Sequence, residues 1–504
     1  MQGKRPKTAK KLADVVNEMY KFIDNQLRFE DFQQPVGMKL HRENRWVQRA
    51  ESIPWDEVEK RYATLFKNQK GNVAKPLRLA LGACIVQAEY GFSDVETALI
   101  IQEHPYLQLF CGYKAYDDSK PPFDPSLMVY FRKRLTPEIL GEINELIIQK
   151  AGQKQAEREE STKDEDDNDE PLPPAVETPK NQGTIIVDAT CAPSYIKYPQ
   201  DTELLNQARE ITEQIIDQLH NPADGEKPRT YRRKARRDYL NITRCKKKTA
   251  KKIRKAIGKQ LGYLRRNLET IDRMLAKEPG KILADRLAKK LDTVKRLYQQ
   301  QKQMHEQGTH SVENRIISLS QPYLRPIVRG KAKSPVEFGA KLDISVVDGW
   351  TRLEYQSFDA YNEAGNLPAM IERYKERTGC YPQRILADKI YRNRSNLAYC
   401  AVHHIRLSGP ALGRPKKDEI RDKRQDYVDE CDRVEVERRF SLAKRKCGLG
   451  LIMTRLEETV CHSIALSILV LNLRKVLCAF LRFTSCFFNI FNFFTPFKKM
   501  AFVQ

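Results

Sequence analysis

The chain has 504 residues, 40% of them hydrophobic, which suffices for the cores of two or three folded units and excludes a chain too polar to fold. Lys and Arg number 89 against 66 Asp and Glu, and the net charge of +23 favours a polyanionic partner over a soluble protein with a merely basic surface. The eleven cysteines form no CxxC pair, which excludes a zinc ribbon, and the N-terminus lacks the apolar core of a signal peptide. We therefore expect reduced thiols and a cytoplasmic protein.

The first 150 residues are expected to form an all-α domain. Apolar residues recur at helical spacing from Leu12 to Phe29, and the run from Pro76 to Val86 is typical of a buried helix that begins at a proline. Ser93 or Asp94 is placed to cap another helix. Residues 124–134 predict one more, with a basic end. Short helices joined by turns occur in DNA-binding modules, but they are too common to assign a function alone.

Residues 151–183 have a different composition. They are acidic, contain several prolines and have few apolar side chains. Such a segment cannot bury enough apolar surface to fold, so we interpret it as a disordered linker.

A short β-branched strand, residues 184–188, follows the linker and ends in a carboxylate. Residues 200–304 then carry three apolar stripes at spacings of three and four, which begin at Leu204, Ile253 and Leu283. These stripes predict a helical hairpin or coiled-coil insertion that packs on itself.

Strand patterns return after the insertion. Asp348-Gly349 between two alternating runs is a hairpin signature, and Gly379 is placed to end a helix. The expected elements in chain order are strands over 336–347 and 351–358, a helix over 367–377, strands over 384–388 and 404–407, a helix over about 432–447 and a last apolar helix over 457–482.

Without the insertion, this order of elements is that of a ribonuclease H-like α/β fold, in which the first and fourth strands are adjacent. Asp188 and Asp388 would then face each other, and Glu437 would come from a helix packed over the same edge. Three such carboxylates can hold two divalent ions about 4 Å apart, Mg²⁺ with Mn²⁺ as a substitute, for phosphodiester cleavage. Either Asp alone is more simply a turn or capping residue, so the hypothesis depends on the ordered combination.

The segment that begins at Arg433 resembles the closing motif of the DDE transposases of bacterial insertion sequences. That motif has Tyr, two residues, Arg, three residues, Glu, six residues and Lys. Arg433, Glu437 and Lys444 fit this spacing, whereas Glu430 stands at the Tyr position. Any function that the motif tyrosine has in the family is therefore not supplied by a tyrosine at this position of the chain.

Other segments extend the resemblance over most of the chain, except the acidic linker and the extreme C-terminus. IIVDATCAPSYIKYPQD around Asp188 and ILADKIYRNRSN around Asp388 are similar to the catalytic strands of the family. RGKAKSPVEFGAKLDISV, which contains Lys341, is similar to its second strand. Residues 76–135 resemble the helical domain found ahead of the catalytic domain in the insertion-sequence-five-like group.

The resemblance implies an enzyme that binds terminal inverted repeats, cleaves DNA and joins the 3′-hydroxyl ends to target DNA. It also implies a homodimer in the synaptic complex and a nucleoid-associated location. Glu435 rivals Glu437 as third carboxylate, but two helical residues point about 200° apart, and the motif spacing selects Glu437. Arg433, Lys444 and Lys341 become expected DNA contacts, with a solvated protein surface as the alternative.

Residues 229–266 carry seventeen Lys or Arg and a single acid, interleaved with tyrosines. So many neighbouring positive charges repel one another unless a polyanion lies near them. The alternative is that these side chains form a solvent-exposed helix face, as most runs of charged residues do. We expect phosphate contacts that position the DNA without reading its sequence. The residues singled out are Arg232, Arg233, Arg236, Arg237, Lys246, Lys247 and Lys248.

We expect the catalytic domain to span residues 184–482, followed by a Phe-rich apolar tail over 483–504. Basic residues interrupt this C-terminal apolar stretch before it reaches a membrane-spanning length, so no membrane partner is expected. Two alternatives stay open: an inactive or regulatory DNA-binding derivative, and a ribonuclease H-like nuclease.

Overall fold

A computed structural model describes residue 20 and residues 28–66, 73–160, 181–277, 283–328, 336–410, 412 and 423–493. Most of the expected helix over 12–29 and most of the acidic segment lie outside the described residues. The same holds for the end of the Phe-rich tail.

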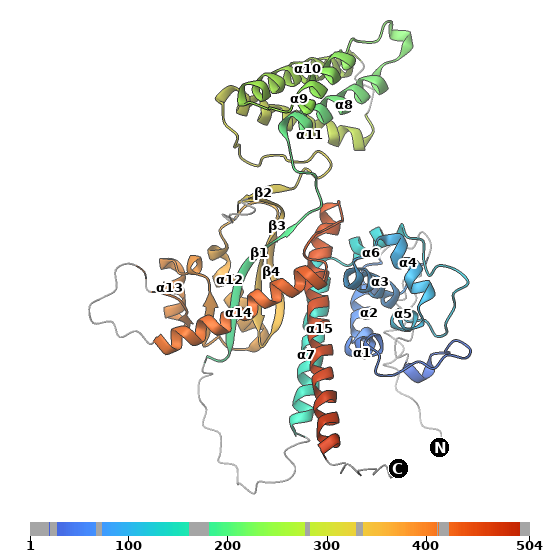
Figure 1. Ribbon diagram of the computed structural model, residues 1–504, viewed down its shortest axis with the longest axis vertical. Helices are drawn as coiled ribbons and strands as arrows, with labels where there is room; N and C mark the ends of the chain where they lie inside the picture. Colours follow the sequence, from blue (N-terminus) through green and yellow to red (C-terminus); the bar gives the residue numbers. More distant parts are fainter. Residues whose placement is uncertain are drawn as a thin grey trace, which may run out of the picture.

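Six strands form one mixed sheet (Figure 1). The central strand β1 pairs antiparallel with β3 and parallel with β5. Strand β3 also pairs antiparallel with β2 and β4, and β5 pairs parallel with β6. The bounds are β1 Thr184–Pro193, β2 Arg325–Val328, β3 Val336–Val347, β4 Trp350–Ser357, β5 Arg384–Ala387 and β6 Arg406–Leu407.

Helices cover both faces of the sheet. On one face, Ile185 and Val187 pack with α12 (Leu367–Thr378) and α13 (Arg394–Val402). On the other face, Ile186 and Leu386 pack against Val436 of α14 (Lys423–Lys446). Because successive strand residues point to opposite faces, every second residue of β1 and β5 is directed towards α14.

The segment between β1 and β2 folds into a helical module with its own hydrophobic core, drawn at the top of Figure 1 and apart from the sheet. The three predicted stripes become long helices, and the basic stretch adds a helix of its own. The bounds are α8 Asp201–Leu219, α9 Arg232–Arg244, α10 Ala250–Lys277 and α11 Asp285–Gln307.

The N-terminal helices share one core with the C-terminal helix α15 (Glu457–Phe493). Figure 1 shows α15 running along α7. The buried Glu89 carboxylate binds both Arg49, at 3.0 Å, and Arg474 of α15. The helices are α1 Arg45–Ser52, α2 Trp55–Ala63, α3 Leu77–Tyr90, α4 Asp94–Glu103, α5 Pro105–Phe110, α6 Leu127–Arg134 and α7 Pro137–Glu160.

Several local predictions are confirmed. Residues 77–86 of α3 are buried, and Ser93 caps α4 in a capping box with Glu96. The Asp348-Gly349 turn has positive φ at both residues, as a two-residue hairpin of type I′ requires. Gly379 ends α12 in the left-handed conformation.

The prediction that the first strand ends at Asp188 is wrong, because β1 continues to Pro193. The parallel pairing with β5 stops at Val187↔Ala387, but the antiparallel pairing with β3 continues to Pro193↔Gly339. Asp188 therefore lies inside its own strand, at the point where the neighbouring strand ends.

Two helix boundaries also differ from the predictions. Helix α14 begins at Lys423 rather than near 432, since its first turns are held by a buried carboxylate, Asp429. Helix α7 continues to Glu160, past the expected start of the linker at 151.

One described helix, over Glu457–Leu477 in α15, is long and apolar enough to cross a membrane by length and composition. Two thirds of this window (67%) is buried against the protein, as in the core helix of a soluble protein. The α15 side chains that are described therefore find apolar partners inside the fold.

Gly339 is required where β1, β2 and β3 meet. A Cβ at this position would lie 2.0 Å from the carbonyl oxygen of Ala192. We predict that Gly339→Ala lowers the free energy of unfolding by about 1–3 kcal/mol, because overpacking forces the strands apart. Gly141→Ala in α7 is the matched control, since its Cβ meets no atom within 4 Å and alanine favours a helix by about 0.5–1 kcal/mol. Denaturant unfolding checks both, and equal stability of the two variants would contradict the prediction.

Candidate active site

The two predicted aspartates follow directly on the parallel β1–β5 pairing. Val187 pairs with Ala387; Asp188 is the next residue of β1, and Asp388 is the residue that follows β5. Residues two apart along a strand point to the same face, so Asp188 shares a face with Ile186 and Asp388 shares one with Leu386. Ile186 and Leu386 both pack against α14. The pairing thus brings the two carboxylates, far apart in sequence, to one place beside α14. Asp388 also accepts a hydrogen bond from the amide of Lys389, at 2.6 Å.

Burial raises the pKa of Asp188 from its ordinary 3.8 to about 6. The amide of Ala189, at 2.7 Å, and the charge of Arg433 oppose this rise, whereas the charges of Asp388 and Glu363 add to it. A half-buried carboxylate with acidic neighbours is stabilised by a cation more than an exposed one would be. A nearby cation would therefore favour the ionised form of Asp188.

Helix α14 is clamped to the parallel strands by ion pairs around the buried carboxylate of Asp429. Arg384 of β5 donates to Thr184 at 2.7 Å, to Asp429 at 3.0 Å and to Asp432 at 2.6 Å. Arg406 of β6 donates to the same Asp429 oxygen at 2.6 Å. Burial raises the pKa of Asp429, but hydrogen bonds from Arg406 and its other donors outweigh it and lower the pKa. The clamp fixes which side of α14 faces the two aspartates.

Arg433 lies between the predicted carboxylates. Its charge lowers the pKa of Asp188, its side chain lines a pocket with Asp388, and its guanidinium is 3.8 Å from Glu437. Glu437 itself is exposed, with 61% of its side chain accessible. The structure therefore brings Asp188, Asp388 and Arg433 together and leaves Glu437 at the edge of the group, paired with Arg433.

Glu435, the rival third carboxylate, lies on another side of α14. It binds Arg439 at 2.7 Å, and its charge acts on Lys475 of α15. The two glutamates thus have different partners, as expected for residues about 200° apart on a helix.

Among the described residues, no group of three or more His, Cys, Asp or Glu side chains is already arranged around a metal position. The donors nevertheless suit Mg²⁺ or Mn²⁺, because carboxylate oxygens are the ligands that hard divalent cations prefer. Asp188 and Asp388 would be the residues that hold such an ion, and its charge would favour the ionised form of Asp188.

A second layer of polar residues, which the sequence analysis missed, lies across the sheet from α14. Asp343 of β3 is fully buried and accepts hydrogen bonds from Tyr361, at 2.8 Å, and Asn366, at 2.6 Å. Tyr391 is also fully buried. Burial is the largest cause of its raised pKa, and the charges of Asp343 and Asp188 raise the pKa further. The available signal was an acid inside an apolar strand, KLDIS.

The expected DNA contacts lie in different surroundings. Lys341 binds Glu363 and donates to the carbonyl of Tyr361 at 2.8 Å, with little of its side chain exposed. Lys444 is half-buried near the end of α14. Arg232 is held by Asp217 at 2.6 Å. The other singled-out cations on and after α9 are exposed: Arg233, Arg236, Arg237, Lys246, Lys247 and Lys248.

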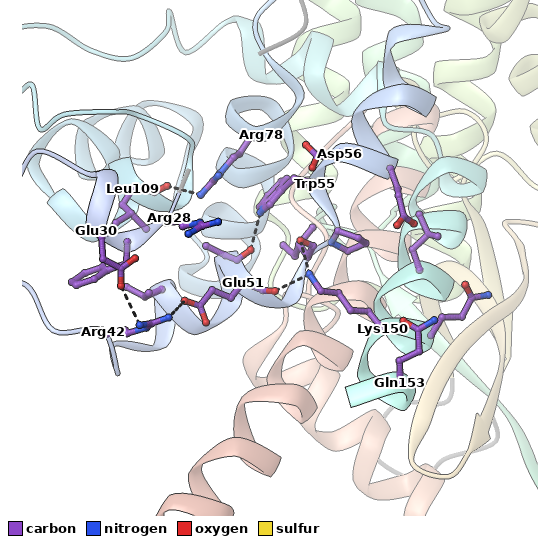
Figure 2. Close-up of a pocket in the computed structure, with 18 residues that line it drawn as sticks. Arg28, Glu30, Arg42, Glu51, Trp55, Asp56, Arg78, Leu109, Lys150 and Gln153 are labelled. Atoms are coloured by element: carbon purple, nitrogen blue, oxygen red, sulfur yellow. Dashed lines mark hydrogen bonds and ion pairs between the residues drawn. The ribbon is translucent and has the colours of Figure 1, made fainter. Parts of the chain in front are cut away.

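A cavity of about 580 Å³ lies among the N-terminal helices, away from these carboxylates (Figure 2). Its polar groups bind one another: Lys150 donates to the Glu51 carbonyl at 2.8 Å, and Arg78 donates to the Leu109 carbonyl at 3.0 Å. The Trp55 indole donates to the Ala50 carbonyl at 2.9 Å. Since these contacts hold the helices together, we assign the cavity no ligand.

We predict that Asp188→Asn stabilises the metal-free protein at pH 8. The folded-state pKa of about 6 lies above the ordinary 3.8, so the folded state binds the proton more tightly and stability falls as pH rises from about 4 to about 6. The shift of about two units corresponds to at most about 3 kcal/mol, a cost that asparagine does not have.

Thermal unfolding in EDTA at pH 4 and pH 8 measures this effect. The variant is expected to melt above the unmodified chain at pH 8 and close to it at pH 4. Asp292→Asn, which removes an exposed carboxylate of α11, serves as control. If Asp188→Asn and the unmodified chain melt at the same temperature at pH 8, the ionised Asp188 does not destabilise the folded state and the prediction is wrong.

Comparisons with known proteins agree with the geometry. Residues 385–474 match the family model described as "Transposase DDE domain", and residues 35–134 match "Transposase domain (DUF772)". The chain is 27% identical over 165 residues, 33% of its length, to "Uncharacterized protein ORF8 in nfe locus" of Rhizobium meliloti, of which it covers 69%. No solved structure matches the chain. The first matched segment contains Asp388, Arg433, Glu437 and Lys444, and the second covers helices α1 to α6. These two matches support a DDE transposase of insertion sequences.

Proposed function

We propose that the chain is an active transposase, which binds the terminal inverted repeats of its element, cleaves the DNA and transfers the 3′-hydroxyl ends to target DNA. The observation that carries this proposal is the position of Asp188 and Asp388. Asp188 lies inside β1 where its pairing with β5 ends, Asp388 directly follows β5, and both lie beside the helix that bears Arg433 and Glu437.

In this proposal Asp188, Asp388 and Glu437 hold the divalent ions. The bound Mg²⁺ or Mn²⁺ would activate the attacking oxygen and neutralise the leaving one. Asp188 would supply its ligand from within β1 and Asp388 from the residue that follows β5, whereas Glu437 must turn inward from its exposed position. Arg433, which lies beside these carboxylates, would be placed to bind a phosphate oxygen of the DNA.

We further propose that the sheet is a ribonuclease H-like catalytic core. The order β4-β3-β1-β5-β6, with β5 and β6 parallel to β1, supports this, and it places the first and fourth core strands side by side. Helices α8 to α11 then form an insertion after the first core strand. Helices α1 to α7 form the expected all-α domain, and α15 completes their core.

The exposed cations of α9 and of the turn after it form the proposed DNA-backbone surface. Tyr231 before α9 holds the guanidiniums of Arg229 and Arg266 over its ring, at 4.7 and 5.0 Å. Cations gathered on one small helical module repel one another, and DNA phosphates would relieve that repulsion. Assembly as a homodimer on two ends remains part of the proposal.

We expect Asp188→Asn and Asp388→Asn each to reduce DNA cleavage to the background level, since each removes a metal ligand from the reacting centre. The assay uses linear DNA that carries the element's ends, with Mg²⁺ or Mn²⁺, and Asp292→Asn as control. Cleavage that survives in either variant would show that the assignment is wrong. Binding of the ends without metal-dependent cleavage by the unmodified chain would favour the regulatory alternative, and cleavage of RNA–DNA hybrids would favour a nuclease.

We expect the triple variant Lys246→Ala, Lys247→Ala, Lys248→Ala to weaken DNA binding of every sequence. The salt slope of log K should fall by about 0.9 for each phosphate that the variant no longer neutralises. The matched control removes three exposed cations of α11: Arg286, Lys289 and Arg296. Fluorescence anisotropy at several salt concentrations measures both slopes. If the two triple variants weaken binding equally, only net charge matters, and the surface assignment would fail.

A further inference from the structure

Two exposed tyrosines lie on the segment that leads from β1 into the helical module. Tyr195 and Tyr198 are 53% and 71% accessible, although aromatic side chains usually bury a large part of their surface. The amide of Tyr195 donates to the carbonyl of Ile452 at 2.9 Å. The ring of Tyr198 meets Phe338 of β3 edge on, with the ring centroids 5.5 Å apart. The backbone of Tyr195 and the ring of Tyr198 are therefore fixed, while much of both side chains stays open to solvent.

Both tyrosines line a cavity of about 220 Å³ where the helical module joins the sheet (Figure 1). Its walls come from this segment, from the first turns of α8, from the chain between residues 317 and 321 and from Arg455. The lining includes amides and hydroxyls that can both donate and accept hydrogen bonds: Gln200, Gln207, Ser318, Ser320 and Gln321. Aromatic faces beside such polar groups suit a planar ring with polar edges.

The charges around the cavity favour an anionic partner. Arg455 is exposed and forms no ion pair with any residue that the structure describes. Lys197 is also exposed, and it binds Glu203, the one acid of the lining, at 2.7 Å. The positive charge of Arg455 is therefore not compensated within the cavity. Proteins bind single-stranded nucleic acid through this combination, because phosphates pair with the cations and bases stack on the aromatic rings.

We propose that this cavity binds unpaired bases of a DNA strand, with Tyr195 and Tyr198 as the stacking surface and Arg455 as a phosphate contact. The bases of duplex DNA are stacked inside the helix, so the partner must be single-stranded or locally unpaired. The inference rests on the proposed function, which makes DNA the partner, and it extends that function from contacts with phosphates to contacts with bases.

Binding of oligodeoxythymidylate to the full chain in EDTA tests the inference, with fluorescence anisotropy as the measurement. An abasic strand of the same length is compared with it, since it keeps the phosphates and lacks the bases. We expect the double variant Tyr195→Ala, Tyr198→Ala to weaken oligothymidylate binding on the order of tenfold, as the loss of base stacking does, and to leave abasic-strand binding unchanged. The double variant Tyr195→Phe, Tyr198→Phe keeps the rings and is expected to bind both strands as the unmodified chain does.

Arg455→Ala is expected to weaken the binding of both strands, because it removes a phosphate contact and leaves the rings in place. Unchanged binding of the abasic strand by this variant would show that Arg455 has no such role. Tyr130→Ala on α6 is the matched control for the tyrosines, since Tyr130 is 55% accessible and does not line the cavity. Thermal unfolding shows that each variant is folded before its binding is compared.

Three outcomes overturn the inference. The first is equal oligothymidylate affinity of the double alanine variant and the unmodified chain, including the case in which the variant changes only the oligomeric state and the tyrosines join copies of the chain. The second is equal weakening by Tyr130→Ala. The third is binding of thymidine monophosphate as tightly as oligothymidylate, which would make the cavity a site for a free nucleotide.

Failure of the inference differs from failure of the proposed function. Metal-dependent cleavage that requires Asp188, with unchanged single-strand affinity of the double alanine variant, overturns only the inference. Single-strand binding that requires Tyr195 and Tyr198, without any metal-dependent cleavage by the unmodified chain, overturns only the proposed catalytic activity.

Discussion

The parallel pairing of β1 with β5 is the constraint on which the candidate site depends. Only this pairing brings Asp188 and Asp388 together, through the register Val187↔Ala387. A slip of one residue would turn one carboxylate to the opposite face of the sheet. Parallel strands also need a crossover connection, which in this chain contains the helical module, the β3–β4 hairpin and α12.

The same strands determine where α14 lies. Arg384 of β5 binds Thr184 of β1 and two aspartates of α14, so one side chain joins all three elements of the site. Below this clamp Val436 packs on Ile186 and Leu386, and beside it Arg433 faces Asp188. Among the described residues, the amide of Ala189 and the charge of Arg433 oppose the rise in the pKa of Asp188 that burial causes.

The sequence analysis succeeded where the signal was local. Asp348-Gly349 demands a particular turn, Gly379 ends a helix, and Ser93 with Glu96 caps one, all through contacts between near neighbours. It failed where the decisive partner was distant. Strand β1 continues past Asp188 because β3 pairs with it, and α14 begins early because Arg384 and Arg406 hold Asp429. The closing motif pointed to Glu437, but no spacing rule could show that Glu430 shares a pocket with Asp388.

The segment that matches the transposase DDE domain contains only part of the candidate site. The matched transposase segment 385–474 begins at β5 and therefore lacks β1, β3 and Asp188. In isolation it would expose the β5 edge and the apolar side of α14, and it would hold one of the two strand aspartates. Segment 385–474 also contains the first half of α15, whose described partners include α7, other N-terminal helices and β4. The site is thus a property of the whole chain, because its carboxylates come from one segment inside the match and one outside it.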